Sequence, residues 1–84
     1  MGKIGEQEIL AVIQDALKPK TGKITLDSAA GVIEEWDSIG HLGILVALDK
    51  FFNGKVASIS EMANADSVKK ILQILRDSSL IIEG

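Results

Sequence analysis

The sequence predicts a small all-α bundle of three main helices plus one short helix, with a long first loop. Three observations predict this fold. Apolar residues recur at helical spacing in three separate segments. Helix-capping residue types stand directly before the second and the last of these segments. The chain has 84 residues, 46% of them hydrophobic, which predicts one globular domain, residues 1–84, with a core within 6–77.

The first helix is expected over residues 6–18. Pro19 ends it, because the residue before a proline disfavours the α region. Its apolar residues share one face, which predicts that this face packs against the rest of the bundle. They are Ile9, Leu10, Ile13, Ala16 and Leu17.

The connection 19–36 is long for a loop in so small a domain. Loops of this length are uncommon when ordered and often carry function. The segment 24–26 alternates like a strand, but no partner strand is evident, so an extended loop is predicted there. We expect the large apolar residues of the connection to pin it across the helix ends: Ile24, Leu26, Val32, Ile33 and Trp36.

The second helix is expected over residues 38–53, capped by Asp37 or Ser38 and ended by Asn53-Gly54. A short helical turn is expected over 60–64. Asp66 or Ser67 caps a last helix over about 67–77. The apolar stripes of the second and last helices are Ile44, Leu45, Leu48 and Phe52, and Val68, Ile71, Leu72 and Leu75. The apolar tail Leu80 to Ile82 either adds a turn or packs over the core.

Composition argues against several classes of function. A chain with no Cys and one His lacks the ligands of a structural zinc site. The longest apolar run, Ile44 to Leu48, is far below the ~20 residues of a membrane span. With a net charge of −3, the chain lacks the basic surface expected of a nucleic-acid binder. We therefore expect a cytoplasmic monomer with no nucleic-acid and no membrane partner.

The segment 34–42 is the most informative part of the chain, because a serine stands where a helix begins after a long loop. Ser38 has two interpretations. Residue type alone favours a helix cap, or the first residue after an Asp37 cap. The alternative is an exposed hydroxyl whose modified form carries a phosphate. Helix N-termini suit a phosphate because their free N–H groups and dipole favour an anion.

The motif Asp37-Ser38-Ile39 resembles the Asp-Ser-Leu attachment motif of acyl carrier proteins and related carrier domains. The resemblance covers about residues 6–77. It includes the order of the helices, the long loop pinned by apolar residues, and the serine that opens the second helix. It continues with the aromatic-glycine end of that helix and the start of the last helix, at Phe51, Phe52 and Gly54 and at Ser67-Val68.

The resemblance implies a carrier that is not itself an enzyme. A phosphopantetheinyl transferase would attach 4′-phosphopantetheine from coenzyme A to Ser38, and the thiol of this arm would carry an acyl group as a thioester. Asp37 would help to position the transferase's metal and the serine. Acyl-activating, condensing or acyltransferase enzymes would read the second helix and its surroundings. The implied recognition residues are Ile39, Gly40, His41, Val46 and Met62.

The second helix departs from the pattern of carriers in fatty acid synthesis, which are usually acidic there. Besides His41, the only charged residues within 38–52 are Asp49 and Lys50. Glycines stand at positions 40 and 43. This favours a specialised fatty acid, polyketide or related pathway, because docking onto basic partners is weakened. Each mid-helix glycine costs about 0.5–1 kcal/mol, so replacing both by alanine is expected to stabilise the fold by about 1–2 kcal/mol. Two explanations of these glycines remain open: a well-packed helix tolerates them, or they allow close approach by a partner or by the arm.

Three alternatives stay open. The cargo of a carrier is an acyl group or an amino acid, as in peptidyl carriers. An unmodified helical interaction module would use Ile39, Val46 and Met62 as its docking patch. A Ser38-His41 hydrolase lacks a Gly-x-Ser-x-Gly elbow and a third group. As the main interpretation, His41 is a boundary residue beside the arm, able to contact the phosphate when protonated, and Trp36 is a loop anchor.

Overall fold

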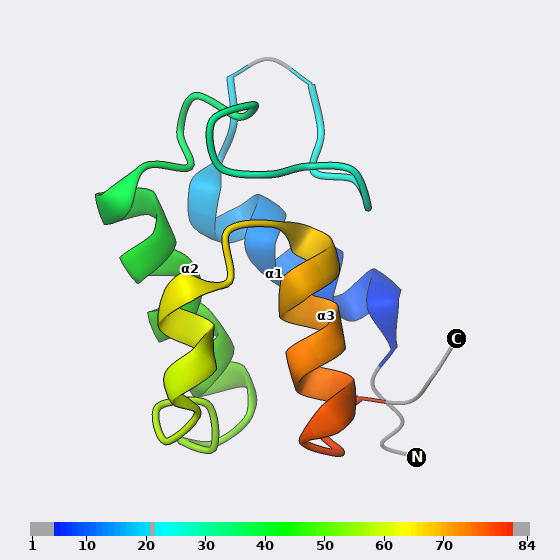
Figure 1. Cartoon of the computed structure of the whole chain (residues 1–84). Helices are drawn as coiled ribbons and strands as arrows, with labels where there is room; N and C mark the ends of the chain where they lie inside the picture. Colours follow the sequence, from blue (N-terminus) through cyan, green and yellow to red (C-terminus); the bar gives the residue numbers. More distant parts are fainter. Residues whose placement is uncertain (1–4, 21, 82–84) are drawn as a thin grey trace.

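Three α-helices and one short 3-10 helix follow one another along the chain (Figure 1). They are α1 (Glu6–Leu17), α2 (Ser38–Phe51), η1 (Ser60–Asn64) and α3 (Val68–Asp77). The computed structural model describes residues 5–20 and 22–81. Within these ranges no strand forms, and two isolated bridges are the only β-type pairings. The prediction of a small all-α fold is confirmed, and its radius of gyration of 11.7 Å is that of a compact chain of this length.

Local chemistry sets the helix ends. The carboxylate of Asp37 accepts a hydrogen bond of 2.8 Å from the Gly40 amide, so Asp37 rather than Ser38 caps α2. Ser67 caps α3 in the same way. α1 ends one residue earlier than predicted, because Lys18 before Pro19 is left-handed, with φ of 46°. α2 ends at Phe51, ahead of a left-handed pair at 53–54.

One hydrophobic core gathers the inner faces of all three helices. α1 and α2 pack against each other, and η1 and α3 complete the bundle. Leu45, predicted in the core stripe of α2, is only half-buried at the edge. Of the predicted apolar tail, Ile81 is buried and Leu80 half-buried, whereas Ile82 lies outside the described residues. The buried helical residues are Ile9, Ile13 and Leu17 of α1, Ile44 and Leu48 of α2, and Val68, Ile71, Leu72 and Leu75 of α3.

The connection between α1 and α2 is pinned by fewer apolar residues than expected. Ile24 and Trp36 are buried in the core and Ile33 packs against it, but Leu26 and Val32 are exposed. A loop need not turn every apolar side chain inward when polar groups also hold it. The prediction that the loop runs pinned across the helix ends is therefore confirmed for three of its five apolar residues.

Hydrogen bonds supply the remaining attachment of this loop. The Ile24 amide donates to the side chain of Gln14 on α1 at 2.8 Å. Near the start of α3, the Ala30 amide donates to the carbonyl of Asp66 at 2.9 Å, and the Val68 amide donates to that of Ser28 at 3.0 Å. Backbone groups of the loop thus find partners at both neighbouring helices, which fixes the path of the chain into Ser38.

The two glycines of α2 differ in what surrounds them. A Cβ atom on Gly40 would overlap the carbonyl oxygen of Glu35 and lie 3.0 Å from a methyl group of Leu17. A Cβ atom on Gly43 would meet nothing within 4 Å. Gly40 therefore lets the backbone of α2 approach the loop, and the expectation that alanine stabilises both positions is corrected for Gly40.

We predict opposite stability changes for Gly40→Ala and Gly43→Ala. The first lowers the free energy of unfolding by about 1–3 kcal/mol, because the new methyl group collides with backbone that cannot move freely. The second raises it by about 0.5–1 kcal/mol, because helix propensity improves in open space. Denaturant unfolding of both variants measures the changes. A gain at both positions would contradict the packing described for Gly40.

Candidate functional site

Ser38 is the first residue of α2 and is exposed. Its hydroxyl makes no hydrogen bond to another described residue, and Asp37 already performs the capping. Ser38 lies on the rim of a groove of about 500 Å³, whose other lining residues include Trp36, His41, Asn64 and Asp66. The fold thus leaves this hydroxyl accessible and without a structural task.

The first turn of α2 presents unpaired backbone donors beside this hydroxyl. The amides of Gly40 and His41 bind the side chain and the carbonyl of Asp37, respectively. The amides of Ser38 and Ile39 have no acceptor among the described residues. Free N–H groups at the positive end of a helix dipole attract an anion, so a phosphate on Ser38 is electrostatically suited to this position.

His41 ties three parts of the chain together beneath the groove. The indole N–H of Trp36 donates to Nδ1 of His41 at 3.0 Å, and Nε2 of His41 lies 2.8 Å from the carbonyl oxygen of Met62. An indole nitrogen only donates and a carbonyl only accepts, so in this arrangement Nδ1 of His41 accepts and Nε2 donates. The two rings lie nearly parallel, at an angle of 13°. This chain of contacts joins the loop, α2 and η1.

The same contacts determine what His41 does chemically. Both ring nitrogens are engaged, so no lone pair of His41 faces Ser38 as a general base. The geometry therefore argues against a Ser38-His41 hydrolase. A protonated His41 has no acceptor at Nδ1, so a contact with a phosphate would require breaking the bond to Trp36.

Acidic groups border the groove. Asp37 uses one carboxylate oxygen for the cap, and its other oxygen has no partner among the described residues. Lys70, with Nζ 3.1 Å from Oδ1 of Asp66, holds the pKa of that carboxyl below its ordinary value. Asp66 is therefore ionised at neutral pH. Over the described part of the chain, no group of three or more potential metal ligands comes together.

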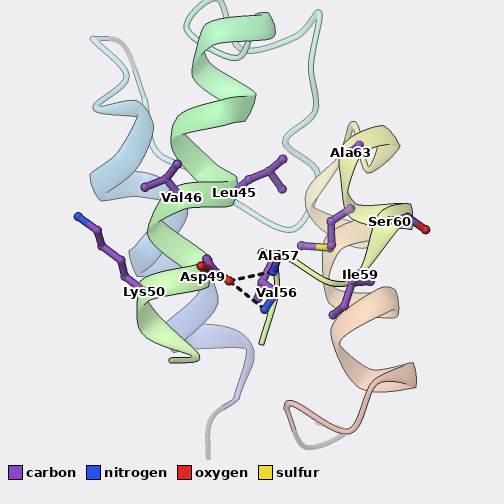
Figure 2. A pocket seen from close by; sticks show the side chains of 10 residues that line it. Leu45, Val46, Asp49, Lys50, Val56, Ala57, Ile59, Ser60 and Ala63 are labelled. Atoms are coloured by element: carbon purple, nitrogen blue, oxygen red, sulfur yellow. Dashed lines mark hydrogen bonds between the residues drawn. The ribbon is translucent and has the colours of Figure 1, made fainter. Parts of the chain in front are cut away.

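A second cavity lies one to two turns further along α2. It measures about 370 Å³ and separates α2 from residues 56–63. Figure 2 shows Leu45 pointing from α2 toward η1, across the cavity. The carboxylate of Asp49 accepts bonds from the amides of Val56 and Ala57, at 3.1 and 2.8 Å, and holds the wall in place (Figure 2). Most of its lining is aliphatic, so the cavity suits an apolar group.

The residues predicted for partner recognition lie in different environments. Ile39 and Val46 are exposed on α2, whereas Gly40 and His41 are half-buried and contact the loop and η1. Met62 is 1% exposed and belongs to the core. The expectation that Met62 forms part of an exposed docking patch is corrected, because its apolar side chain closes the core under η1.

Leu42 and Gly43 lie on the same exposed face of α2 as Ile39 and Val46, and the sequence reasoning did not assign them to it. The spacing of these residues in the sequence could have indicated that they share a face. Positions 39, 42, 43 and 46 follow the i, i+3, i+4, i+7 pattern of one helix face.

No family model, curated protein or solved structure matches the chain. None of the helices in residues 5–20 and 22–81 has the length and apolar character that crossing a membrane requires.

We predict that His41→Ala lowers the free energy of unfolding by about 2–4 kcal/mol, because two hydrogen bonds are lost and a buried indole N–H is left unpaired. Trp36 is the only tryptophan, so its fluorescence reports the change directly. Its emission should shift to longer wavelength as water reaches the ring. Ser38→Ala is the control and should change stability by less than about 0.5 kcal/mol. Equal effects of the two substitutions would contradict the role of His41.

Proposed function

We propose that the chain is an acyl carrier whose cargo is held on a 4′-phosphopantetheine arm attached to Ser38. The observation that carries this proposal is the state of the Ser38 hydroxyl. It is exposed, it has no hydrogen-bond partner among the described residues, and it stands at the start of a helix of 14 residues that Asp37 already caps. The resemblance of Asp37-Ser38-Ile39 to the attachment motif of carrier proteins supports the same conclusion.

The loading step uses Ser38 as the nucleophile and a phosphopantetheinyl transferase as the catalyst. Oγ of Ser38 forms a bond to the pantetheine-bearing phosphorus of coenzyme A, and the pyrophosphate bond of coenzyme A breaks. Adenosine 3′,5′-bisphosphate leaves, and the transferase accepts the hydroxyl proton. Once attached, the arm supplies a thiol that holds an acyl group as a thioester, in a chain that has no cysteine of its own.

The residues around Ser38 fit this arm. The free amides of Ser38 and Ile39 suit a phosphodiester at the helix N-terminus. The second carboxylate oxygen of Asp37, which has no partner among the described residues, would help to position the transferase's metal. The groove lined by Trp36 and Asn64 offers a polar and apolar surface for the pantetheine chain.

The cavity between α2 and η1 favours an acyl cargo over an amino acid. Its walls include Leu45, Val56, Ile59 and Met62, and its two charged side chains are Lys50 and Asp49, whose Oδ1 accepts both backbone amides. An aliphatic chain gains about 0.8 kcal/mol for each methylene group buried. The ammonium group of an aminoacyl thioester would lose hydration there and would meet the like charge of Lys50.

The charge of α2 favours a specialised pathway rather than general fatty acid synthesis. Its first turn has no acidic side chain after the Asp37 cap, and Asp49 is turned to the wall of the cavity. The acyl-activating, condensing or acyltransferase partners of this carrier would therefore dock without a strongly basic surface.

We predict that the protein gains the mass of one phosphopantetheine unit when it is incubated with coenzyme A and a broad-specificity phosphopantetheinyl transferase. Intact-protein mass spectrometry measures the gain. Ser38→Ala should remain unloaded while keeping its fold, because the cap of α2 is Asp37.

Two results would reject this assignment. Loading of Ser38→Ala would place the attachment elsewhere. A folded parent protein that stays unloaded by an active transferase would favour the unmodified interaction module instead.

We also predict that cargo changes stability in a way that depends on its polarity. An octanoyl thioester should raise the melting temperature by about 4 °C or more over the arm alone, since 1 kcal/mol shifts a domain of this size by about 4–8 °C. An alanyl thioester should leave it unchanged. Differential scanning calorimetry of the three loaded forms measures this. Equal melting temperatures would show that the cavity between α2 and η1 does not take the cargo.

A further inference from the structure

His41 is the single histidine of the chain, and the single tryptophan, Trp36, is hydrogen-bonded to it. Histidine is the residue type whose side chain ordinarily changes charge between about pH 5 and 8. Carboxyl groups ordinarily titrate below this range and lysines above it, and the chain has no cysteine. A side-chain charge change in this range therefore acts directly on the contact between His41 and Trp36.

Protonation of His41 conflicts with one of its two hydrogen bonds. The indole N–H of Trp36 donates to Nδ1 at 3.0 Å, so a proton added to Nδ1 would point at the indole hydrogen. The contact with Met62 has no such conflict, because Nε2 can donate to the carbonyl oxygen in both charge states. A charge on His41 therefore separates the ring from Trp36 and spares the contact with η1.

The charged groups around His41 come from the loop and from the start of α3. On the loop, Asp37 lines the groove together with His41, and the carboxylate of Glu35 accepts a backbone amide at 3.1 Å. Directly before α3, Asp66 also lines the groove, and its Oδ1 is paired with Lys70. Both carboxylates that line the groove favour a positive charge on the ring.

The two helical segments that contribute to the His41–Met62 contact add no further charge to the lining of the groove. On η1, Glu61 is exposed and does not line the groove. On α2, Asp49 and Lys50 follow His41 by two turns or more and line the cavity between α2 and η1 instead. The charge of His41 is therefore balanced between Asp37 and Asp66, which favour it, and the indole N–H, which opposes it.

Asp66 supplies the stronger support for a charged ring. Lys70 foremost, and a charge on His41 to a smaller degree, lower the pKa of the Asp66 carboxyl, so Asp66 and His41 lie within electrostatic reach of each other. With its pKa below the ordinary value, Asp66 keeps its negative charge throughout the range in which histidine titrates. Its Oδ2 has no partner among the described residues.

Trp36 connects this ring to the wall of the groove beside Ser38. It is 2% exposed, and its indole N–H has no acceptor other than His41 among the described residues. A buried donor that loses its partner has to reach another acceptor or water, because an unpaired polar group is costly to bury. Separation from His41 therefore moves Trp36 toward solvent and displaces the wall of the groove that it forms.

We propose that His41 is a pH-sensitive switch between the loop and η1. With Nδ1 unprotonated it holds Trp36 in the groove, and protonation releases Trp36 while the contact with Met62 remains. The released arrangement binds one more proton than the closed one, so it is favoured as the pH falls and the closed one as the pH rises. The switch belongs to the unmodified chain and does not rest on the function proposed above.

The test follows the unmodified protein from about pH 8 to about pH 5 with two signals. One is the emission of Trp36, and the other is the ring Cε1–H resonance of His41 in NMR, each unique in the chain. Both should follow one transition with a shared midpoint between about pH 5 and 7. The emission should shift to longer wavelength and acrylamide should quench it more strongly. The helical signal in circular dichroism should stay constant.

His41→Gln separates the charge of this residue from its hydrogen bonds. A glutamine side chain offers one acceptor for the indole and a donor for the carbonyl of Met62, but it does not titrate. In this variant the emission of Trp36 should stay at its short wavelength over the whole range.

Asp66→Asn tests the support for the charged ring. The transition should move to lower pH by about 0.5 unit, because a neutral amide no longer stabilises the charge of His41. Asp27→Asn is the matched control, since Asp27 also pairs with a lysine, Lys69, but does not line the groove. It should leave the transition where it is in the parent.

Three results would overturn the switch. Constant emission of Trp36 while the His41 resonance titrates would show that a charged ring keeps its tryptophan. Loss of the helical signal together with the change in emission would indicate acid unfolding of the whole chain. An unchanged transition in His41→Gln would assign it to another group. None of these measurements involves loading of Ser38, so failure of the switch leaves the carrier proposal standing, and failure of loading leaves the switch.

Discussion

The structure around Ser38 depends on one chain of hydrogen bonds, from the indole of Trp36 through the ring of His41 to the carbonyl of Met62. It joins the loop, α2 and η1. A neutral imidazole is suited to this place, because it offers one acceptor and one donor on opposite sides of a small ring. Trp36 and His41 line the groove beside Ser38, and Met62 lines the cavity between α2 and η1. These hydrogen bonds therefore hold one wall of each.

The hydroxyl of the proposed attachment residue, Ser38, stays accessible because neighbouring residues make the contacts that hold this part of the fold. Asp37 caps the helix, Gly40 lets α2 approach the loop, and His41 anchors η1. Ser38 is left with an exposed hydroxyl beside two amides that have no acceptor among the described residues. The proposed attachment of an arm would require an accessible hydroxyl, and this division of tasks leaves the Ser38 hydroxyl accessible.

Sequence patterns predicted the helices well and the fate of single apolar residues less well. Helical spacing, caps and Pro19 placed all four helical segments within two residues at each end. In contrast, Met62 was expected on a docking surface and is buried, and Leu26 and Val32 were expected to pin the loop and are exposed. Outside regular helices no periodicity tells which side of the chain faces the core, so composition alone does not assign burial there.

The sequence by itself determined the helical class, the order of the elements and the position of Ser38 at a helix start, because these follow from local spacing and capping. Only the tertiary structure decided the tasks of the residues around it. The closeness of Glu35 to Gly40, the open space at Gly43 and the two partners of His41 depend on segments that meet in space. Two glycines of one helix are alike in a sequence, and only their neighbours distinguish a packing requirement from an open surface.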